Sequence, residues 1–197
     1  MPWLRPPGPI APGMRIGLLG GSFNPPHEGH LHVSEVALKR LGLDYVWWLV
    51  APQNPLKGRA GLAPLEDRTR QARMIARHPR IVVMDIERGL GTHYSIDTLG
   101  ALQRRFPLVH FFWLMGSDNL AIFRRWRRWQ EIARRVPVAV VQRPGSVLAQ
   151  LSAMPMQHAQ MRRRIVILDG RRNALSSTAL RAKERLDEAV VRTIPPC

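Results

Sequence analysis

The stretch GGSFNPPHEGH, residues 20–30, follows directly on the apolar run RIGLL and precedes a segment with helical periodicity. Glycine lets the backbone approach a neighbour closely, and the two prolines restrict the chain as it enters the next element. The segment EGHLHVSEVALKRLG spaces its apolar residues as a helix does and stops at Gly42. We therefore predict a turn from a buried strand into a helix, with His27 and His30 at the helix start.

This histidine pair is the first candidate for chemistry. The unpaired N–H groups and the positive dipole end of a helix N-terminus attract anions, so two imidazoles beside them favour a phosphate site. Zinc is an alternative, with His27, His30 and His32 as ligands, but the chain has no H-E-x-x-H motif and no cysteine or carboxylate cluster. It also lacks a P-loop, and its glycine spacing does not match the G-x-G-x-x-G fingerprint.

Length and composition predict one globular domain. The chain has 197 residues, 45% of them hydrophobic, and no apolar run approaches the length of a membrane span. Its first residues lack the apolar core of a secretory signal. The single cysteine, Cys197, excludes an internal disulfide framework and is typical of a reducing, cytoplasmic location.

The net charge of +16 arises from 30 basic and 14 acidic residues, and favours polyanionic partners, either nucleic acid or nucleotides. A solvated, arginine-rich surface explains the same composition. The clusters RRWRRW at 124–129 and RRR at 162–164 lie within patterns that also carry core residues, so charge alone does not decide between these readings.

Apolar runs alternate with helical segments along most of the chain. Residues 1–13 are rich in proline and glycine and are expected to be a disordered or arm-like extension of a single domain at 14–197. Strands are predicted at 14–20, 45–51, 80–86, 109–116, 136–142 and 163–169. Helices are predicted near 29–41, 64–78, 95–106, 118–135 (broken), 146–160 and 176–193. Continuous apolar strands separated by helices indicate a doubly wound, Rossmann-like parallel sheet with helices on both faces, whose ligands bind at the carboxyl ends of the strands.

Polar residues follow several of these strands. Lys57 lies in a loop after the second strand, where a cation can reach an anion. Thr92 or Ser95 can cap the helix after the third strand, and Gly116 permits close approach after the fourth. Asp118 can cap a helix, hold a ribose hydroxyl or bind a metal.

Two further patterns lie nearer the C-terminus. Trp126 and Trp129 are either core residues or a stacking platform for a planar ring. The stretch LSSTALR, 175–181, places three hydroxyl groups and Arg181 at a helix start, where helix capping and phosphate binding are both plausible roles. Together, these signals fit a nucleoside triphosphate held between two helix N-termini.

Six motifs occur in this order: GGSFNPPHEGH, PQNPLK, THYSIDTL, GSDNL with a following tryptophan, QRPG and LSSTALR. In this combination the chain resembles the bacterial nicotinate-nucleotide adenylyltransferases, of the nucleotidyltransferase superfamily marked by an H-x-G-H histidine pair. The resemblance covers residues 14 to about 190. It implies adenylyl transfer from ATP to nicotinate mononucleotide, giving nicotinate adenine dinucleotide and pyrophosphate in NAD synthesis, with Mg²⁺.

The resemblance also assigns roles to individual residues. It implies a catalytic role for His27, His30, Lys57 and Arg181. It implies ATP contacts for Gly20, Gly21, Ser22, Phe23, His27, His30, Gly116, Asp118, Ser176, Ser177, Thr178 and Arg181. It implies mononucleotide contacts for Asn24, Lys57, Thr92, Tyr94, Ser95, Trp126 and Arg127, the last at a position often aromatic in the family. It implies no resident metal site, and no nucleic-acid or membrane partner.

Two other functions remain open from the residues. A sister enzyme that adenylates phosphopantetheine or cytidylylates an alcohol phosphate shares the phosphate motifs, but has no need of THYSIDTL or Trp126. A basic nucleic-acid-binding module accounts for the charge of +16 but gives no reason for GGSFNPPHEGH.

Overall fold

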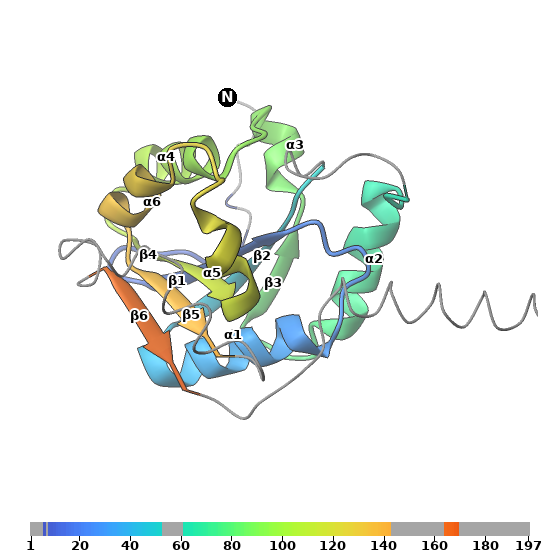
Figure 1. The fold of residues 1–197 in the computed structure, drawn as a ribbon, viewed down its shortest axis with the longest axis horizontal. Coiled ribbons are helices and arrows are strands. Elements are labelled where there is room, and N and C mark those ends of the chain that lie inside the picture. The colour runs from blue at the N-terminus through green and yellow to red at the C-terminus, as the bar shows by residue number, and fades with distance from the viewer. Residues whose placement is uncertain (1–5, 7, 53–60, 143–163, 170–197) are drawn as a thin grey trace, which may run out of the picture.

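The computed structural model describes residues 6, 8–52, 61–142 and 164–169. Within them lies a six-stranded, entirely parallel sheet with the strand order β3-β2-β1-β4-β5-β6 (Figure 1). The strands are β1 (Arg15–Gly21), β2 (Tyr45–Val50), β3 (Ile81–Met84), β4 (His110–Gly116), β5 (Val138–Val141) and β6 (Ile165–Leu168). The helices are α1 (Glu28–Leu41), α2 (Leu65–Ile75), α3 (Ile86–Leu90), α4 (Ser95–Arg105), α5 (Ser117–Phe123) and α6 (Trp129–Arg135). The predicted doubly wound α/β fold is confirmed.

The order of the strands defines a switch point between β1 and β4. From β1 the chain proceeds outward through β2 to β3, and from β4 it proceeds in the opposite direction through β5 to β6. In such sheets the loops diverge where the order reverses, which opens a crevice beyond the carboxyl ends of the two central strands. Residues 20–30 follow β1 and residues 116–118 follow β4, so both predicted motifs meet at this crevice.

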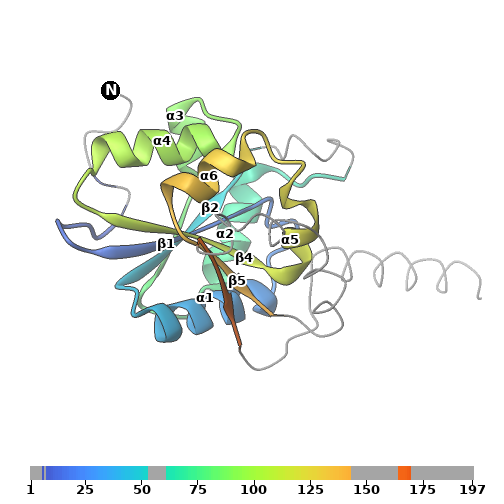
Figure 2. The same cartoon turned by 60° about the vertical axis from the view of Figure 1, so that its left-hand side comes forward.

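Helices cover both faces of the sheet, as Figure 2 shows after rotation. One face packs Val33, Ala37 and Leu38 of α1 and Ala72 of α2 against β-strand residues such as Trp48. The opposite face packs Ile96, Leu99 and Leu102 of α4 with Ile132 and Ala133 of α6. Because the central strands are buried on both faces, their apolar residues run without alternation, as expected for parallel sheets, whereas Val166 on the edge strand β6 is exposed.

Local signals explain where the first helix ends. Gly42 is the C-cap of α1 and adopts φ 58° and ψ 45°, the left-handed region in which glycine has no steric penalty. Its N–H bonds to the carbonyl of Leu38. The predicted stop at this glycine is therefore confirmed.

The structure adds one helix to the prediction, corrects one helix cap and locates one predicted break. The five-residue helix α3 was not expected, because its segment is too short to show helical periodicity. The N-cap of α4 is Tyr94, with no side-chain cap, so neither Thr92 nor Ser95 caps this helix. The break predicted in 118–135 lies at residues 124–128, where Arg128 has φ 53°.

The described part of the N-terminal extension packs on the domain. The side chain of Ile10 is partly buried against the core of the α4 face, and Gly8 lies against Trp47 and Val82. The N–H of Gly13 donates to the carbonyl of Leu108 at 2.8 Å, beside the amino end of β4. Gly8, Ile10 and Gly13 therefore contact the domain.

The helices predicted at 146–160 and 176–193 lie outside the described residues. Among the described residues, no helix is both long enough and apolar enough to cross a lipid bilayer.

Candidate active site

A histidine capping box opens α1. His27 is the N-cap residue, and its Nδ1 accepts a hydrogen bond from the backbone N–H of Gly29 at 3.0 Å. The Nδ1 of His30 accepts from the backbone N–H of His27 at 3.2 Å, and the two ring centroids lie 3.9 Å apart. Since each Nδ1 is an acceptor, each neutral imidazole carries its hydrogen on Nε2. The cap therefore selects the tautomer and makes both Nε2 atoms donors.

Aromatic packing holds His30 in place. The ring of Phe23, only 1% exposed, lies 4.5 Å from the ring of His30 and is stacked on Trp48 at 5.2 Å. The indole Nε1–H of Trp48 donates to Ser34 Oγ at 2.7 Å, and Ser34 Oγ donates to the carbonyl of His30 at 2.9 Å. Phe23, predicted to contact ATP, thus has its side chain beneath the histidines. Its φ of 48° shows that this placement costs backbone strain.

Close packing favours glycine at position 20, near the end of β1. A Cβ on Gly20 would lie 3.0 Å from the ring of Trp113, so the backbone has little room for a side chain there. The carbonyl of Gly21 accepts the N–H of Ala51 at 2.9 Å, which ties the ends of β1 and β2 together. Both glycines lie at the carboxyl end of β1, and the tight packing at Gly20 is additional to any contact with a nucleotide.

Two polar side chains hold the turn after β1. The carbonyl of Ser22 accepts a hydrogen bond from Arg68 Nη1 at 2.5 Å. The amide of Asn24 donates to the carbonyl of Gly61 at 2.8 Å and accepts from the N–H of Ala63 at 3.3 Å. Asn24, predicted as a mononucleotide contact, is therefore engaged with the backbone that precedes α2. Sequence reasoning missed Arg68, although its position beside Thr69 and Ala72 on the buried side of α2 is a usable signal.

The start of α4 presents unpaired backbone donors. The carbonyl of Tyr94 accepts the N–H groups of residues 97 and 98, while the N–H groups of Ser95 and Ile96 have no acceptor among the described residues. These two N–H groups and the positive end of the helix dipole favour an anion at this position. The hydroxyl of Thr92 lies 2.8 Å from that of Thr98, so this predicted contact residue braces the loop before α4.

Trp126 and Arg127 lie beside that helix start. The guanidinium carbon of Arg127 lies 4.6 Å from the centre of the Tyr94 ring, a cation–π distance. Trp126 is half-buried, and its ring packs edge-to-face with Trp113 at 5.9 Å and with Phe123 at 5.5 Å. The structure thus brings together two of the predicted mononucleotide residues, Tyr94 and Arg127, and Trp126 is next to Arg127 in the chain.

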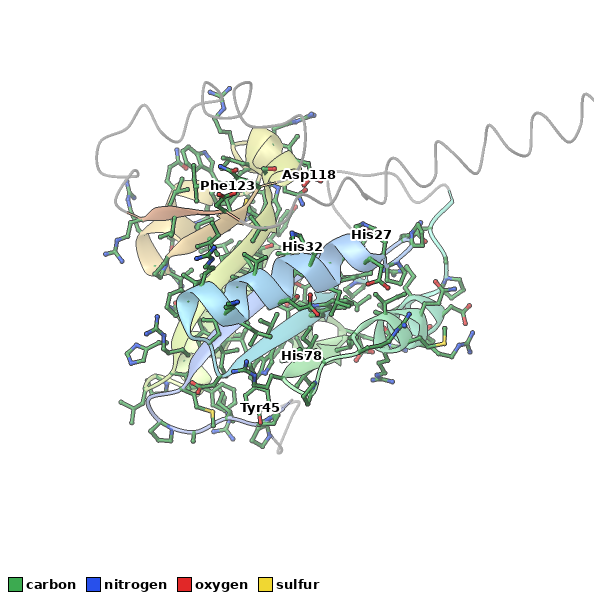
Figure 3. All side chains as sticks on the ribbon, turned by 90° about the horizontal axis from the view of Figure 1, so that it is seen from below. His27, His32, Tyr45, His78, Asp118 and Phe123 are labelled. Atoms are coloured by element: carbon green, nitrogen blue, oxygen red, sulfur yellow. The ribbon has the colours of Figure 1, made fainter. Side chains whose placement is uncertain are left out.

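The segment after β4 supplies the other side of the crevice. Gly116 is the N-cap of α5 and Asp118 lies exposed in its first turn; Figure 3 shows Asp118 there and His27 at the first turn of α1. No side-chain hydrogen bond caps α5, so Asp118 does not act as its N-cap residue. Trp129, the second candidate stacking residue, is 8% exposed and belongs to the core.

The chain is similar to known proteins along most of its length. A family model described as cytidylyltransferase-like matches residues 18–183. A protein of Methylorubrum extorquens strain PA1 is 52% identical over 186 residues, covering 86% of this chain and 100% of that protein. A protein of Parvibaculum lavamentivorans is 58% identical over 144 residues, covering 73% of this chain and 72% of that protein. Both bear the name probable nicotinate-nucleotide adenylyltransferase. This chain belongs to the nicotinate-nucleotide adenylyltransferase family.

Solved structures share the fold of this family member. A Plasmodium falciparum nicotinic acid mononucleotide adenylyltransferase complexed with NaAD superposes with a TM-score of 0.68 at 17% identity, covering 86% of this chain and 83% of that one. The same protein complexed with APC gives a TM-score of 0.67 at 17% identity. At this identity the likeness establishes the fold, and it agrees with the single domain seen here.

A buried carboxyl group distinguishes the α3–α4 junction of this adenylyltransferase. Glu87 is 6% exposed, and its Oε1 accepts a hydrogen bond from Thr98 Oγ1 at 3.1 Å. Burial raises the pKa of Glu87 to about 7, and the bond from Thr98 lowers it by a smaller amount. The carbonyl of Glu87 also accepts the N–H of Thr92 at 3.1 Å. Glu87, missed by sequence reasoning, therefore ties the loop before Tyr94 to both helices.

Five candidate residues of this adenylyltransferase lie outside the described residues: Lys57, Ser176, Ser177, Thr178 and Arg181. Among the residues that are described, no three or more His, Cys, Asp or Glu side chains are grouped as a metal site. The zinc alternative with His27, His30 and His32 therefore finds no support in the described part of the chain.

Proposed function

We propose that this protein transfers the adenylyl group of ATP to nicotinate mononucleotide, forming nicotinate adenine dinucleotide and pyrophosphate in the synthesis of NAD. The observation that carries the proposal is the capping box of α1, which fixes His27 and His30 at the end of the turn that follows β1, one of the two strands at the switch point of the sheet. Family membership at 52% identity over a whole relative supports the same reaction.

The reaction needs no nucleophile or base from the protein. A phosphate oxygen of the mononucleotide attacks the α-phosphorus of ATP and forms a new P–O bond. The bond from that phosphorus to the α–β bridging oxygen of ATP breaks, and this bridging oxygen leaves as part of pyrophosphate. The attacking oxygen is already deprotonated near neutral pH. Negative charge grows on the α-phosphate in the transition state, and the Nε2–H groups of His27 and His30 are suited to stabilise it. Positioning and electrostatic stabilisation together account for catalysis.

We infer the remaining phosphate contacts from the family resemblance. Lys57 is assigned to the phosphate of the mononucleotide. Ser176, Ser177, Thr178 and Arg181 are assigned to the β- and γ-phosphates, which leave as pyrophosphate. Gly116 and Asp118 are assigned to the adenosine, because they follow the carboxyl end of β4 across the crevice from the histidines.

The start of α4 is suited to the nicotinate carboxylate. The N–H groups of Ser95 and Ile96 offer two donors to two carboxylate oxygens, and Arg127 adds a positive charge against the ring of Tyr94. Trp126 is assigned to stack on the pyridine ring, because its half-buried ring is anchored by Trp113 and Phe123.

We propose that Mg²⁺ enters with ATP rather than as a resident ion. The described residues offer no group of three metal ligands, whereas the phosphate oxygens of ATP are ligands that Mg²⁺ prefers. The metal would neutralise charge on the departing pyrophosphate. We place this reaction in the cytoplasm, with the two nucleotides as the partners of the protein.

A pyrophosphate-release assay with three acceptors tests the proposal. Nicotinate mononucleotide, nicotinamide mononucleotide and phosphopantetheine are each supplied with ATP and Mg²⁺, and the dinucleotide product is identified by mass. We expect rapid release with nicotinate mononucleotide only. Release with phosphopantetheine and with neither pyridine nucleotide would replace the proposal with a sister-enzyme function. Binding of duplex DNA without any release would favour a nucleic-acid-binding module.

A further inference from the structure

Arg68 of α2 is a buried cation without a carboxylate partner. Its side chain is 1% exposed, and it takes part in none of the salt bridges found among the described residues. Burial lowers its pKa, with a smaller opposing effect from the charge of Glu66. A buried guanidinium is costly to desolvate, so the groups that compensate it indicate what it does.

Those groups are four backbone carbonyls from three separate segments. Nη1 donates to Ser22 at 2.5 Å and to Ala51 at 2.8 Å. Nη2 donates to Pro52 at 3.1 Å, and Nε donates to Ala63 at 2.8 Å. A planar guanidinium carries five N–H donors in a fixed fork, which no other side chain provides. The hydrogen bonds of Arg68 thus join backbone segments that are too irregular to pair with one another as strands.

The three segments all lie at the carboxyl edge of the sheet. Ser22 follows β1 in the turn that leads to His27, while Ala51 and Pro52 follow β2. Ala63 lies just before α2. A second bridge runs parallel to this one, because Asn24 bonds to the backbone of Gly61 and Ala63. Among the described residues, Arg68 and Asn24 therefore both hold the turn carrying the histidines to the neighbouring loops, and Arg68 also bonds to the backbone that follows β2.

We propose that Arg68 is a positioning residue for adenylyl transfer, which holds the β1–α1 turn, and through it the Nε2–H groups of His27 and His30, in register with the loop after β2. This inference rests on the proposed function of the crevice. We call the four hydrogen bonds of Arg68 to backbone carbonyls the Arg68 clamp. Without this clamp, Ser22 can move relative to Ala51, and the histidine donors move with it. A displacement near 1 Å of groups that act in the transition state lowers turnover by about a hundredfold.

Arg68→Met and Arg68→Lys test the inference, with Arg73→Met as the control. Arg73 lies exposed on the same helix, so its replacement changes charge and helix composition without touching a loop. Turnover is measured per folded molecule, at a temperature where circular dichroism shows each variant fully folded. We expect kcat to fall about a hundredfold in Arg68→Met and at least tenfold in Arg68→Lys. We expect KM for ATP to change less than kcat, and Arg73→Met to match the parent protein.

A merely structural role predicts a different pattern. It lowers the melting temperature and the folded fraction, and leaves kcat per folded molecule unchanged. That result in either Arg68 variant overturns the inference. Hydrogen exchange gives an independent reading, since positioning predicts faster exchange at residues 22–24 and 51–52 and unchanged exchange inside α1. If Arg68→Met does not fold, Arg68→Lys decides, and failure of both to fold also overturns the inference.

The acceptor panel separates this inference from the proposed function. All variants are assayed with whichever acceptor the parent protein uses. A parent protein active only on phosphopantetheine contradicts the proposed substrate, while the ratio of kcat between Arg68→Lys and parent still tests the clamp. A parent protein inactive on every acceptor overturns both.

Discussion

His30 has two roles that substitution can separate. Its Nδ1 accepts the N–H of His27 and so completes the cap of α1, while its Nε2–H is assigned to the α-phosphate. In His30→Asn the amide oxygen can occupy the position of Nδ1, which keeps the cap and removes the Nε2 donor. In His30→Gln the longer amide reaches the Nε2 position and abandons the cap. His30→Ala removes both.

The two losses differ in size and in the property they affect. Losing a side-chain cap costs about 0.5–2 kcal/mol of folding stability. Losing one preorganised donor to a developing charge costs about 10²–10³ in kcat, or roughly 3–4 kcal/mol. We therefore expect His30→Asn to keep near-parental stability with kcat reduced about 10²–10³-fold. His30→Gln should lose stability yet exceed His30→Asn in kcat, and His30→Ala should show both defects.

Denaturant unfolding measures the stability, and pyrophosphate release at saturating ATP measures kcat. His32→Asn is the matched control, because His32 belongs to the same helix but not to the capping box. Near-parental turnover in His30→Asn and His30→Ala would remove the phosphate role assigned to this histidine. Equal kcat in the Asn and Gln variants would show that the position of the donor is irrelevant, and would refute the tautomer argument.

Three other predictions concern the acceptor, pH and the N-terminal arm. We expect kcat/KM to be about 10²–10³-fold higher for nicotinate than for nicotinamide mononucleotide, because the NH₂ of the amide would face two backbone N–H groups. Arg127→Ala should reduce this preference, and Trp126→Ala should raise KM for nicotinate mononucleotide. Equal kcat/KM for the two acceptors would contradict the predicted preference. The pKa of Glu87 is about 7 in the folded protein and 4.5 in the unfolded chain, so the folded state binds more protons at this group. The contribution of Glu87 to the free energy of unfolding therefore falls by up to roughly 3 kcal/mol as pH rises from about 4.5 to about 7. Glu87→Gln should remove that slope in unfolding curves measured between pH 5 and 8, and an unchanged slope refutes the assignment. Ile10→Ala should cost about 1–3 kcal/mol of stability and leave kcat unchanged, since the arm packs beside the amino end of β4, away from the crevice; a large loss of kcat contradicts this placement.

Much of the fold was predictable because it is encoded locally. Strands buried on both faces must be continuously apolar, and a helix facing a core must repeat its apolar residues every three or four positions. These rules placed β1, α1 and the glycine stop at Gly42 correctly. The H-x-G-H pair could be assigned to a helix start for the same reason, because a turn residue pattern and a helical period meet at residues 20–30.

The tertiary structure decided whatever depends on contacts between distant residues. Arg68 bonds to Ser22, 46 positions away, and nothing in the local pattern of α2 says which carbonyls lie opposite it. Likewise, Ile10 is partly buried because the arm meets the α4 face, and Tyr94 meets Arg127 only because the sheet brings α4 and the α5–α6 connection together. Sequence periodicity reports which side of an element is buried, since that depends on the element alone. The partner that covers a buried polar group is set by the packing of the whole sheet. The role of Arg68 in holding the loops of the site together is therefore visible only in the tertiary structure.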